Sequence, residues 1–347
     1  MGMTDEGSKL DLYEMISEAN INAETWLITV CEGDFAGEKA LVSGGEIVWS
    51  SGEGFTGSHA GEITKISENG LTDIDGVSVY AELLCGEKKL VICGAGHVSM
   101  SIITIGKMMG MHVTVIDDRL QFANNAIAQG ADEVKFKEFR DALEEVPGDD
   151  DTFFVIVTRG HRYDKECLRS ITKKPHAYIG MMGSRRRVKI VKDDLAKEGI
   201  SREVLDSVCM PVGLDIGAET PEEIAIAIMA EIIEVKNRKK RNFGFPGDVM
   251  KALLSDERDR LTMATIVSRQ GSAPRGIGTK MLIARDGGIT GTIGGGCIEG
   301  SVIAKGRRML MKEDHRPVIM EVDMTIGAAE DEGMVCGGRV KVLLETV

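Results

Sequence analysis

A glycine loop between an apolar run and a helical stretch constrains this chain more than any other feature of its sequence. The run Lys89–Cys93 reads Lys-Leu-Val-Ile-Cys, which predicts a buried parallel strand. It leads into Gly-Ala-Gly-His-Val-Ser at 94–99, which matches G-x-G-x-x-G with serine in the last position. Asp117 ends the next apolar run, 23 residues after Gly94, where an acidic residue can bind a ribose hydroxyl. The predicted dinucleotide contacts of this Rossmann-like unit are Gly94, Gly96, His97 and Asp117.

Strand and helix patterns continue to alternate along the middle of the chain. Apolar runs at 112–116, 152–158 and 177–181 are each followed by a helical stretch. A last helix opens with Thr-Pro-Glu-Glu at 220–223, a capping box with proline in the first helical position. Repeated strand–helix units build a parallel sheet. The predicted fold class is therefore α/β, a doubly wound parallel Rossmann-like sheet flanked by small α+β segments.

The segments before and after this unit resemble each other. We interpret the likeness as a divergent internal repeat, and the alternative is a chance similarity between two small β-rich segments. The first copy has Phe55 where the second has Cys297, so the C-terminal copy is expected to hold the chemistry. The matched segments are 25–30 with 262–267, 37–42 with 278–283, 47–55 with 289–297, and 79–84 with 340–345.

The domain boundaries follow from these patterns and from one charged stretch. A basic run at 236–241 is followed by glycine and proline, which is typical of a solvated linker. The predicted organisation is a degenerate copy at 1–86, the Rossmann-like domain at 87–236, a linker at 237–255, and an intact copy at 256–347.

Composition excludes several classes of protein. The formal net charge is −13, which argues against a nucleic-acid-binding protein with a basic face. No uncharged apolar stretch reaches the length of about 18 residues that a membrane span needs, and the first residues lack the apolar core of a signal peptide. The seven cysteines are scattered and include no C-x-x-C, so a disulfide framework or zinc knuckle is not expected. We expect a cytoplasmic protein without nucleic-acid or membrane partners.

Loops after two further strands add polar residues to the predicted ligand crevice. In an open α/β sheet the carboxyl ends of the strands form this crevice, so Arg159 and His161 should face it. Arg185 lies in the first turn of a helix, where the helix dipole alone disfavours a cation, and this favours an anionic ligand. The alternatives are that His161 only caps or packs locally, and that the domain keeps a Rossmann shape without a nucleotide.

A second glycine loop, Gly291-Thr-Ile-Gly-Gly-Gly-Cys-Ile-Glu299, leads into a helix near the C-terminus. A glycine loop at a helix start can bind an anion, and the same position lowers the pKa of a thiol. Cys297 and Cys336 are thus candidate nucleophiles, sulfur carriers or metal contacts, with buried inert cysteines as the alternative. The other residues predicted to hold a ligand here are Arg275, Lys280, Gly294, Gly295, Gly296 and Glu299.

At these motifs the chain resembles the xanthine dehydrogenase accessory family, also called XdhC/CoxI. The likeness lies in VICGAGHVS, VIDDR, VTRGHRYD, YIGMMGSRRR, PVGLDIGAETPEEIA, GSAPRGIGTKMLIARDGG, GTIGGGCIEG and GMVCGG. It implies a role in maturing molybdenum hydroxylases: binding the molybdopterin cofactor, assisting its sulfuration, and inserting it into the apo-enzyme. Cys297 and Cys336 occupy the cysteine positions of the family, and Cys297 is the implied molybdenum contact. The family's cysteine-bearing part usually precedes the Rossmann-like part, whereas here the intact copy follows it.

The expected function is therefore that of an accessory chaperone with molybdopterin as cofactor. Its expected partners are a molybdenum hydroxylase apo-enzyme, a sulfur-donor protein and a second copy of itself in a homodimer. The alternative is an oxidoreductase that uses NAD(P) or another nucleotide, although the sequence offers no convincing lysine or tyrosine for hydride transfer. A third possibility is a binding scaffold that uses a nucleotide only for regulation. The sequence leaves open whether the chain is an enzyme, which client it serves, and whether sulfur, selenium or the whole cofactor is transferred.

Overall fold

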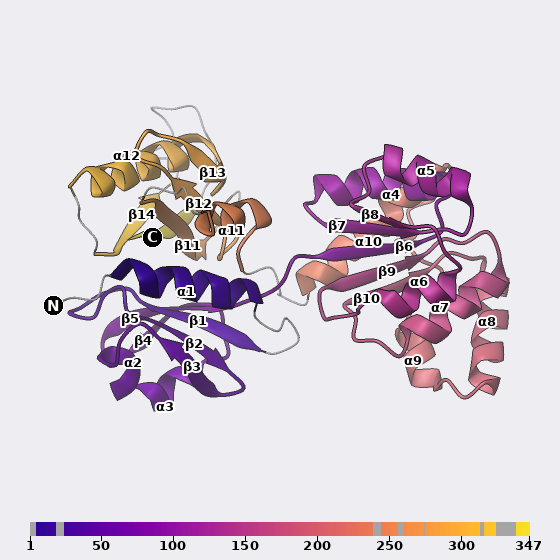
Figure 1. The fold of residues 1–347 in the computed structure, drawn as a ribbon, viewed down its shortest axis with the longest axis horizontal. Helices are drawn as coiled ribbons and strands as arrows, with labels where there is room; N and C mark the ends of the chain where they lie inside the picture. Colours follow the sequence, from indigo (N-terminus) through magenta and orange to yellow (C-terminus); the bar gives the residue numbers. More distant parts are fainter. Residues whose placement is uncertain are drawn as a thin grey trace. The chain divides into compact units, whose positions relative to one another are not determined.

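The computed structural model describes residues 5–18, 24–238, 244–255, 260–273, 275–312, 316–323 and 338–347. The chain forms two compact units, coloured along the sequence in Figure 1. One unit combines Met1–Cys85 with Asn242–Val347, and the other is Gly86–Arg241.

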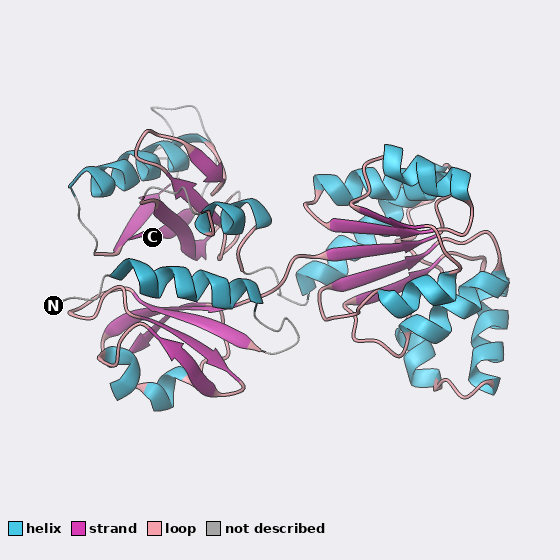
Figure 2. Ribbon diagram, in the orientation of Figure 1, coloured by secondary structure: helices cyan, strands magenta, loops and turns pink. Residues whose placement is uncertain are grey.

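The unit Gly86–Arg241 is built on a five-stranded parallel sheet of order β10-β9-β6-β7-β8. Figure 2 shows the strands of this unit in magenta and its helices in cyan. The prediction of a parallel Rossmann-like sheet is confirmed. The order reverses between β6 and β9, and in such sheets the ligand crevice lies at this reversal. The strands are β6 (Lys89–Cys93), β7 (His112–Ile116), β8 (Glu133–Lys135), β9 (Thr152–Ile156) and β10 (Tyr178–Met181).

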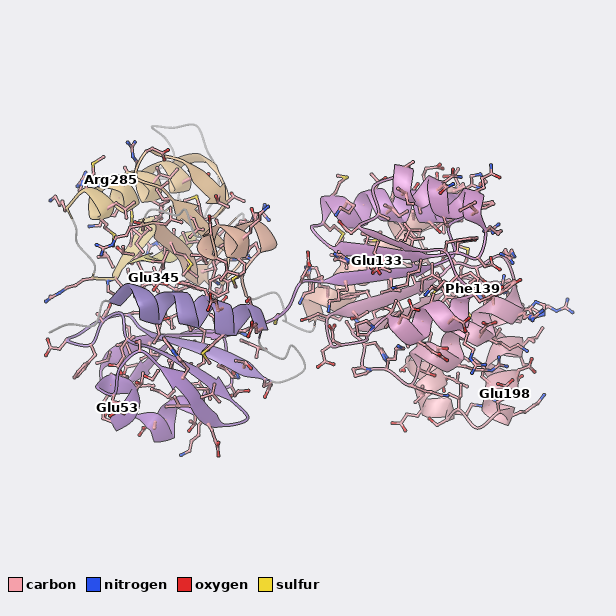
Figure 3. All side chains as sticks on the ribbon, in the orientation of Figure 1. Glu53, Glu133, Phe139, Glu198, Arg285 and Glu345 are labelled. Atoms are coloured by element: carbon pink, nitrogen blue, oxygen red, sulfur yellow. The ribbon has the colours of Figure 1, made fainter. Side chains whose placement is uncertain are left out.

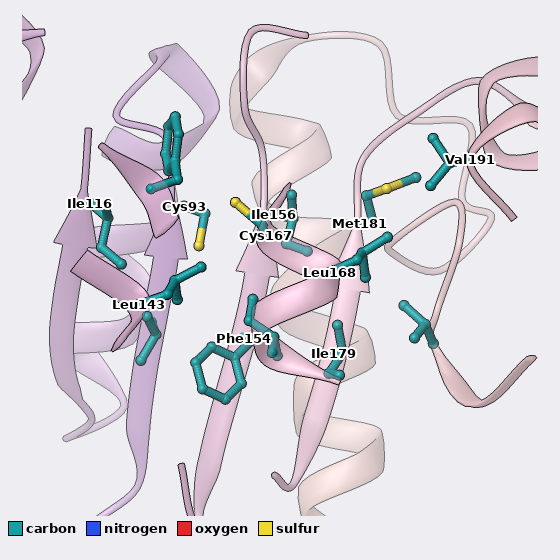
Figure 4. Close-up of a cluster of buried hydrophobic side chains, with 14 of the residues drawn as sticks. Cys93, Ile116, Leu143, Phe154, Ile156, Cys167, Leu168, Ile179, Met181 and Val191 are labelled. Carbon is teal, nitrogen blue, oxygen red and sulfur yellow. The ribbon is translucent and has the colours of Figure 1, made fainter. Parts of the chain in front are cut away.

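Helices cover both faces of this sheet because alternate residues of each strand are apolar on both sides. On β6, Val91 and Cys93 join one buried cluster, and Leu90 and Ile92 join another. Figure 4 shows the first cluster, in which Cys93 lies beside Cys167. Its helices are α6 (Phe139–Glu145), α7 (His161–Ile171), α8 (Arg185–Lys197) and α9 (Arg202–Ser207). The second cluster packs under α4 (His97–Met108), α5 (Leu120–Ala128) and α10 (Pro221–Arg238).

The helix starts expected from sequence carry their caps. The Glu223 carboxylate accepts the N–H of Thr220 at 3.1 Å, and the Thr220 hydroxyl oxygen accepts the N–H of Glu223 at 3.3 Å. This reciprocal pair is the predicted capping box of α10. Ser184 likewise caps α8 by accepting the N–H of Arg187.

The other unit contains two antiparallel sheets with the same strand order, β3-β2-β1-β5-β4 and β13-β12-β11-β15-β14. In each copy one helix precedes the first strand along the chain, and helical residues lie between the third and fourth strands. This shared order of elements supports the internal repeat. The first copy contains α1 (Asp5–Glu18), β1 (Thr25–Val30), β2 (Lys39–Ser43), β3 (Glu46–Ser50), α2 (Phe55–Ser58), α3 (Ala60–Ile63), β4 (Gly70–Ile74) and β5 (Val77–Leu83). The second contains α11 (Gly247–Leu253), β11 (Thr262–Gln270), β12 (Lys280–Ile283), β13 (Ile289–Gly291), α12 (Gly296–Lys312), β14 (Val318–Asp323) and β15 (Arg339–Thr346).

Strand registers correct part of the sequence alignment between the copies. Lys39 lies opposite Thr29, and Lys280 lies opposite Thr265, so Thr29 is equivalent to Thr265. Residues 25–30 therefore match 261–266 rather than 262–267. By the same reasoning residues 79–84 match 342–347, because Glu82 and Glu345 hold the same position. The error arose because short apolar runs offer several registers of similar hydrophobic pattern. The match at 37–42 agrees with the registers, since Val42 lies opposite Ile47 as Ile283 lies opposite Ile289. The gapless match at 47–55 holds at Ile47 but not beyond it, because a bulge in the first copy makes Ser50, rather than Trp49, equivalent to Gly291.

The two copies pack together around reciprocal charged pairs. Lys39 of the first copy binds Glu345 of the second at 2.5 Å, and Lys280 of the second binds Glu82 of the first. Glu345 is labelled in Figure 3. Because the same positions meet in both directions, the contact has the character of an isologous dimer interface. A buried apolar cluster joins the two copies by equivalent positions as well, since each copy contributes two residues to it. Its members are Cys31 and Tyr80 of the first copy and Val267 and Leu343 of the second.

The predicted linker at 237–255 is wrong as a description of the whole stretch. Helix α10 continues to Arg238, and residues 247–253 form α11. Val249 and Leu253 of α11 are buried against Met263 and Leu282 of the second sheet, together with Tyr13 of α1. The apolar spacing in this short segment was hidden by the neighbouring glycine, proline and charges. Among the described helices, none combines the length and apolar character needed to cross a membrane.

Candidate functional site

The first candidate site lies at the glycine loop after β6. Gly94 has φ of +108°, and a Cβ there would lie 2.7 Å from the carbonyl oxygen of Val157 in the loop after β9. Only glycine permits this contact between the two strand ends. Gly96 caps α4 without a side-chain bond, and a Cβ on it would meet nothing within 4 Å. The start of α4 therefore presents backbone N–H groups beside an uncrowded glycine, with His97 exposed next to it.

Asp117 lies at the predicted strand end, but its carboxylate is already bound. It is fully buried. One oxygen accepts the N–H of Ala95 at 2.8 Å, and Arg119 donates from its backbone N–H, Nε and Nη2 at 3.0, 2.9 and 2.8 Å. A carboxylate has about four acceptor positions, and these four bonds use them. The prediction that Asp117 itself binds a ribose hydroxyl needs correction, since Arg119 covers it.

Arg159 is held in a second ion pair at the same edge of the sheet. Its guanidinium donates to both carboxylate oxygens of Asp118 and to the hydroxyl of Tyr163, on which it also stacks. The bonds from Arg159 keep the pKa of the Asp118 carboxyl below its usual value. Because β6 lies between β9 and β7, this pair joins the two strands that flank the glycine loop.

Arg187 and Asp164 form a third pair behind the loop after β9. Burial raises the pKa of the Asp164 carboxyl, although a 2.6 Å bond from the Thr158 hydroxyl and the charge of Arg187 oppose the shift. The predicted residues His161 and Arg185 are both exposed, at the starts of α7 and α8. Sequence reasoning missed the partner residues, although the Asp-Asp-Arg run directly after an apolar strand was a usable signal. The missed residues are Asp118, Arg119, Asp164 and Arg187.

The second candidate site is in the C-terminal copy. Ala273 of the loop after β11 packs in the same cluster as Ile293 of the glycine loop before α12. A Cβ on Gly338 would lie 2.3 Å from the carbonyl oxygen of Ser272, so the chain returns to this place after the third motif. Gly338, the last residue of the third motif, therefore lies against the loop after β11. Arg275 is exposed here. Cys336 and the side chain of Cys297 lie outside the described residues.

The glycine loop before α12 is partly filled by the chain's own carboxylate. Gly294, Gly295 and Gly296 all have positive φ, at 129°, 77° and 63°, which favours glycine at each position. Glu299 accepts the N–H groups of Ile293 at 3.0 Å and Gly295 at 2.9 Å. Burial alone would raise the pKa of the Glu299 carboxyl, but bonds from Thr292 and these amides lower it overall. Two of the glycines predicted to hold an anionic ligand thus donate their N–H groups within the loop, Gly295 to Glu299 and Gly294 to the hydroxyl of Thr292.

The prediction that Lys280 holds a ligand is wrong, because this lysine is buried. Its side chain is 1% exposed, and its ammonium binds Glu82 and the carbonyl oxygens of Gly244 and Gly278 at 3.1 and 3.2 Å. Burial lowers the pKa of this ammonium, and Glu82 counteracts the shift. The lysine joins the two copies and cannot contact a ligand at the surface.

The two copies differ at the helix start that follows their third strand. In the first copy, the Glu38 carboxylate accepts the N–H groups of Phe55 at 2.9 Å and Thr56 at 3.0 Å. Because α2 begins at Phe55 and α12 begins at Gly296, and Ser50 is equivalent to Gly291, these two positions correspond to Gly296 and Cys297 in the second copy. There Thr279 replaces Glu38, and its hydroxyl donates to the carbonyl oxygen of Gly276 at 2.8 Å. The second copy thus lacks the carboxylate that fills this helix start in the first.

A metal site built only from the described side chains is not seen. In the ranges that the structure describes, no three or more His, Cys, Asp or Glu side chains are grouped so that they could hold a metal ion. The predicted metal contact of Cys297 falls on a side chain outside those ranges.

Comparisons with known families cover both candidate sites. Residues 90–232 match the XdhC Rossmann domain, and residues 254–323 match the XdhC and CoxI family. The first match contains the glycine loop after β6 and the arginine–aspartate pairs. The second contains the glycine loop before α12.

Individual relatives are similar over parts of their length. The Escherichia coli (strain K12) uncharacterised protein YqeB is 33% identical over 162 residues, which are 46% of this chain and 30% of that protein. A probable subunit of xanthine dehydrogenase from Bacillus subtilis (strain 168) is 27% identical over 161 residues, 46% of this chain and 47% of that protein. The crystal structure of a xanthine dehydrogenase from Bacillus halodurans matches with a TM-score of 0.52 at 25% identity, covering 66% of this chain and 63% of that one. The chain thus aligns with less than half of either curated relative.

Proposed function

This chain belongs to the XdhC and CoxI family of xanthine dehydrogenase accessory proteins, and we propose that it helps to mature a xanthine dehydrogenase-like molybdenum hydroxylase. In this proposal it binds the molybdopterin cofactor, assists its sulfuration and delivers it to the apo-enzyme. A sulfur-donor protein, a homodimeric state and a cytoplasmic location belong to the same proposal. The names of two relatives, of which one is a xanthine dehydrogenase and the other a probable subunit of such an enzyme, support a client of this class.

The observation that carries the proposal is the exchange of Glu38 for Thr279. In the first copy a carboxylate sits on the helix start, which shows that this backbone geometry suits an anion. The second copy keeps the glycine loop and has a cysteine in the matched position, but not the acid. We therefore assign the anionic ligand to the N–H groups at the start of α12, with Arg275 as the nearby exposed cation.

Molybdopterin fits these groups because its phosphate and dithiolene are anionic. When bound, it would supply the metal centre that the client uses. The start of α12 would hold the anion by hydrogen bonds and by the positive end of the helix dipole. The same dipole favours the thiolate form of Cys297. Cys297 and Cys336 are the proposed thiols for metal contact or sulfur transfer, and Glu299 keeps the loop in shape.

The direct test restores the missing carboxylate. Thr279→Glu should place an internal anion on α12, as Glu38 does on α2, and so prevent cofactor binding. Thr279→Gln has the same size without the charge and is the matched control. Each variant is co-expressed with a molybdenum-cofactor supply, purified without oxygen, assayed for bound molybdopterin, and tested for activation of apo-xanthine dehydrogenase. Cofactor retained by Thr279→Glu at the level of Thr279→Gln would contradict this assignment.

A thiol variant separates binding from sulfur chemistry. Cys297→Ala should abolish client activation while the protein remains folded. Full client activity with Cys297→Ala would reject the thiol role but leave the anion site in place.

We further propose that the crevice at β6 and β9 binds a nucleotide, either NAD(P) or the nucleotide form of the cofactor. The reversal of strand order, the requirement for glycine at position 94 and the open start of α4 support this. An NAD(P)-dependent oxidoreductase is the second candidate function, and these same features favour it. Oxidation of NADH with a small carbonyl substrate, lost in Gly94→Ala, would establish it. Binding without turnover favours a regulatory or carrier role.

A further inference from the structure

The ribose end of the Rossmann crevice, at the carboxyl end of β7, holds residues that bear on which nucleotide would bind there. In such crevices the acid at the end of the second strand accepts the ribose hydroxyls, whereas a nearby arginine accommodates a ribose phosphate. This chain has both residue types at the end of β7, as Asp117 and Arg119. Their contacts decide which of the two is available to a ligand.

The acid is not available. Asp117 is fully buried, and its acceptor positions are used by Ala95 and by three donors of Arg119. A ribose diol would have to displace charge-assisted hydrogen bonds to reach it. Asp118 beside it is bound at both oxygens by Arg159. Both acids at this strand end are therefore neutralised by arginines.

The arginine is available. The side chain of Arg119 is 32% exposed, and its guanidinium stacks on Phe122 with 3.5 Å between Cζ and the ring centroid. Its bonds to Asp117 use the Nε–H and one Nη2–H. A guanidinium has five N–H donors, so the other three have no acceptor among the described residues. Asp117 and Phe122 thus fix the orientation of the Arg119 guanidinium, whose remaining N–H groups can donate to a ligand.

We propose that Arg119 makes the crevice selective for a nucleotide whose ribose at β7 carries a phosphate, over one whose ribose presents a free diol. The inference rests on the proposed nucleotide site. A phosphate would receive two or more charge-assisted bonds from a guanidinium already held in place. A diol would find no vacant carboxylate oxygen on Asp117. The probes that differ only in this group are NADPH and NADH.

The experiment compares the two probes on the full chain by fluorescence titration at constant ionic strength. NADPH should bind the unmodified protein at least about tenfold more tightly than NADH. This difference is expected because only the phosphate of NADPH receives charge-assisted hydrogen bonds from Arg119. Competition by 2′,5′-ADP should likewise exceed that by 5′-ADP. Arg119→Gln should remove the preference, chiefly by weakening NADPH. Arg202→Gln removes an exposed arginine that pairs with Asp193 in the same unit and should change nothing.

Loss of Arg119 leaves a buried carboxylate with fewer donors, so the folding of the variant is checked by its melting temperature. If Arg119→Gln does not fold, the unmodified protein and Arg119→Lys decide the question. Lysine keeps the charge but not the fork, and should retain only part of the preference. Equal affinities, or tighter binding of NADH, would overturn the selectivity and leave the nucleotide site standing. If neither probe nor competitor binds, the nucleotide site itself fails, and the selectivity with it.

Discussion

Breaking the buried ion pair between Glu82 and Lys280 should lower the free energy of unfolding of the two-copy unit far more than breaking an exposed ion pair would. Both side chains are 1% exposed, and they belong to different copies of the repeat. Glu82 also accepts the N–H of Gly244 at 2.9 Å, and Lys280 lies over the ring of Phe245 at 4.5 Å. The perturbations are Lys280→Met, Glu82→Gln and the double variant. Glutamine keeps an acceptor for Gly244, and methionine keeps an apolar contact with Phe245.

The magnitude follows from which charge is left behind. Removing one partner of a buried pair leaves the other charge in a medium of low polarity, which costs about 3–5 kcal/mol. Either single change should therefore reduce the free energy of unfolding by that amount. The double variant has no uncompensated charge at this place, and should lie within about 1–2 kcal/mol of the unmodified protein or be more stable. The coupling between the two changes, measured by the double-mutant cycle, should thus be large and favourable.

The chain provides its own reporter for the measurement. Both of its tryptophans, Trp26 and Trp49, are in the first copy. Urea unfolding followed by tryptophan fluorescence therefore reports the two-copy unit without interference from the Rossmann unit. The control is Arg339→Gln, which removes an exposed partner of Asp323 in the second copy and should cost about 0–1 kcal/mol.

Either of two results would contradict the prediction of a compensated, buried charge pair. Single variants that each cost less than about 1 kcal/mol would show that the pair is not effectively buried. A double variant as unstable as the sum of the singles would show that the two charges do not compensate each other. In that case the pairing of the copies would rest on the apolar contacts alone.

Three further predictions concern other parts of the chain. Gly94→Ala should destabilise the Rossmann unit and abolish nucleotide binding, because a Cβ would lie 2.7 Å from a backbone oxygen; unchanged melting and binding would contradict it. Glu223→Ala removes an acceptor from the start of α10 and should cost about 0.5–2 kcal/mol, measured by denaturant titration with circular dichroism. The carbonyl of Phe55 and then Asp75 raise the pKa of His59 above 6.5, so its contribution to stability is complete below 6.5 and is lost as the pH rises through the folded-state value. An NMR titration of Asp75→Asn should show the pKa of His59 lowered, and an unchanged value would exclude Asp75 as a cause.

The internal repeat explains why only one copy of the small domain has the proposed site. Glu38 on the helix start of the first copy satisfies backbone donors from within and stabilises the loop there. In the second copy Thr279 takes the place of Glu38, so the N–H groups at the start of α12 have no equivalent carboxylate to bind. The reciprocal pairs Lys39–Glu345 and Lys280–Glu82 hold the two copies together. The first copy thus supports the second through a contact that a homodimer could otherwise provide.

The Rossmann unit could be predicted closely from sequence because its signals are local. A parallel strand buried on both faces is a continuous apolar run, and a helix start carries its own capping residues. The strands at 89–93 and 112–116 and the capping box at Glu223 are found as predicted. Helix α11 was missed because seven residues give too short an apolar period to be recognised beside glycine and proline.

The sequence by itself determined the α/β class, the repeat and the loops on which ligands should bind. Only the tertiary structure decided which side chains in those loops are available. Lys280 and Glu82 are 198 positions apart in the sequence, and Asp117 and Ala95 are 22 apart, so neither hydrogen bond can be predicted from a local sequence pattern. The physical reason is that a buried polar group must find partners wherever the fold brings them. A residue type shows what a side chain can bind, and packing determines whether its donors and acceptors remain free to do so.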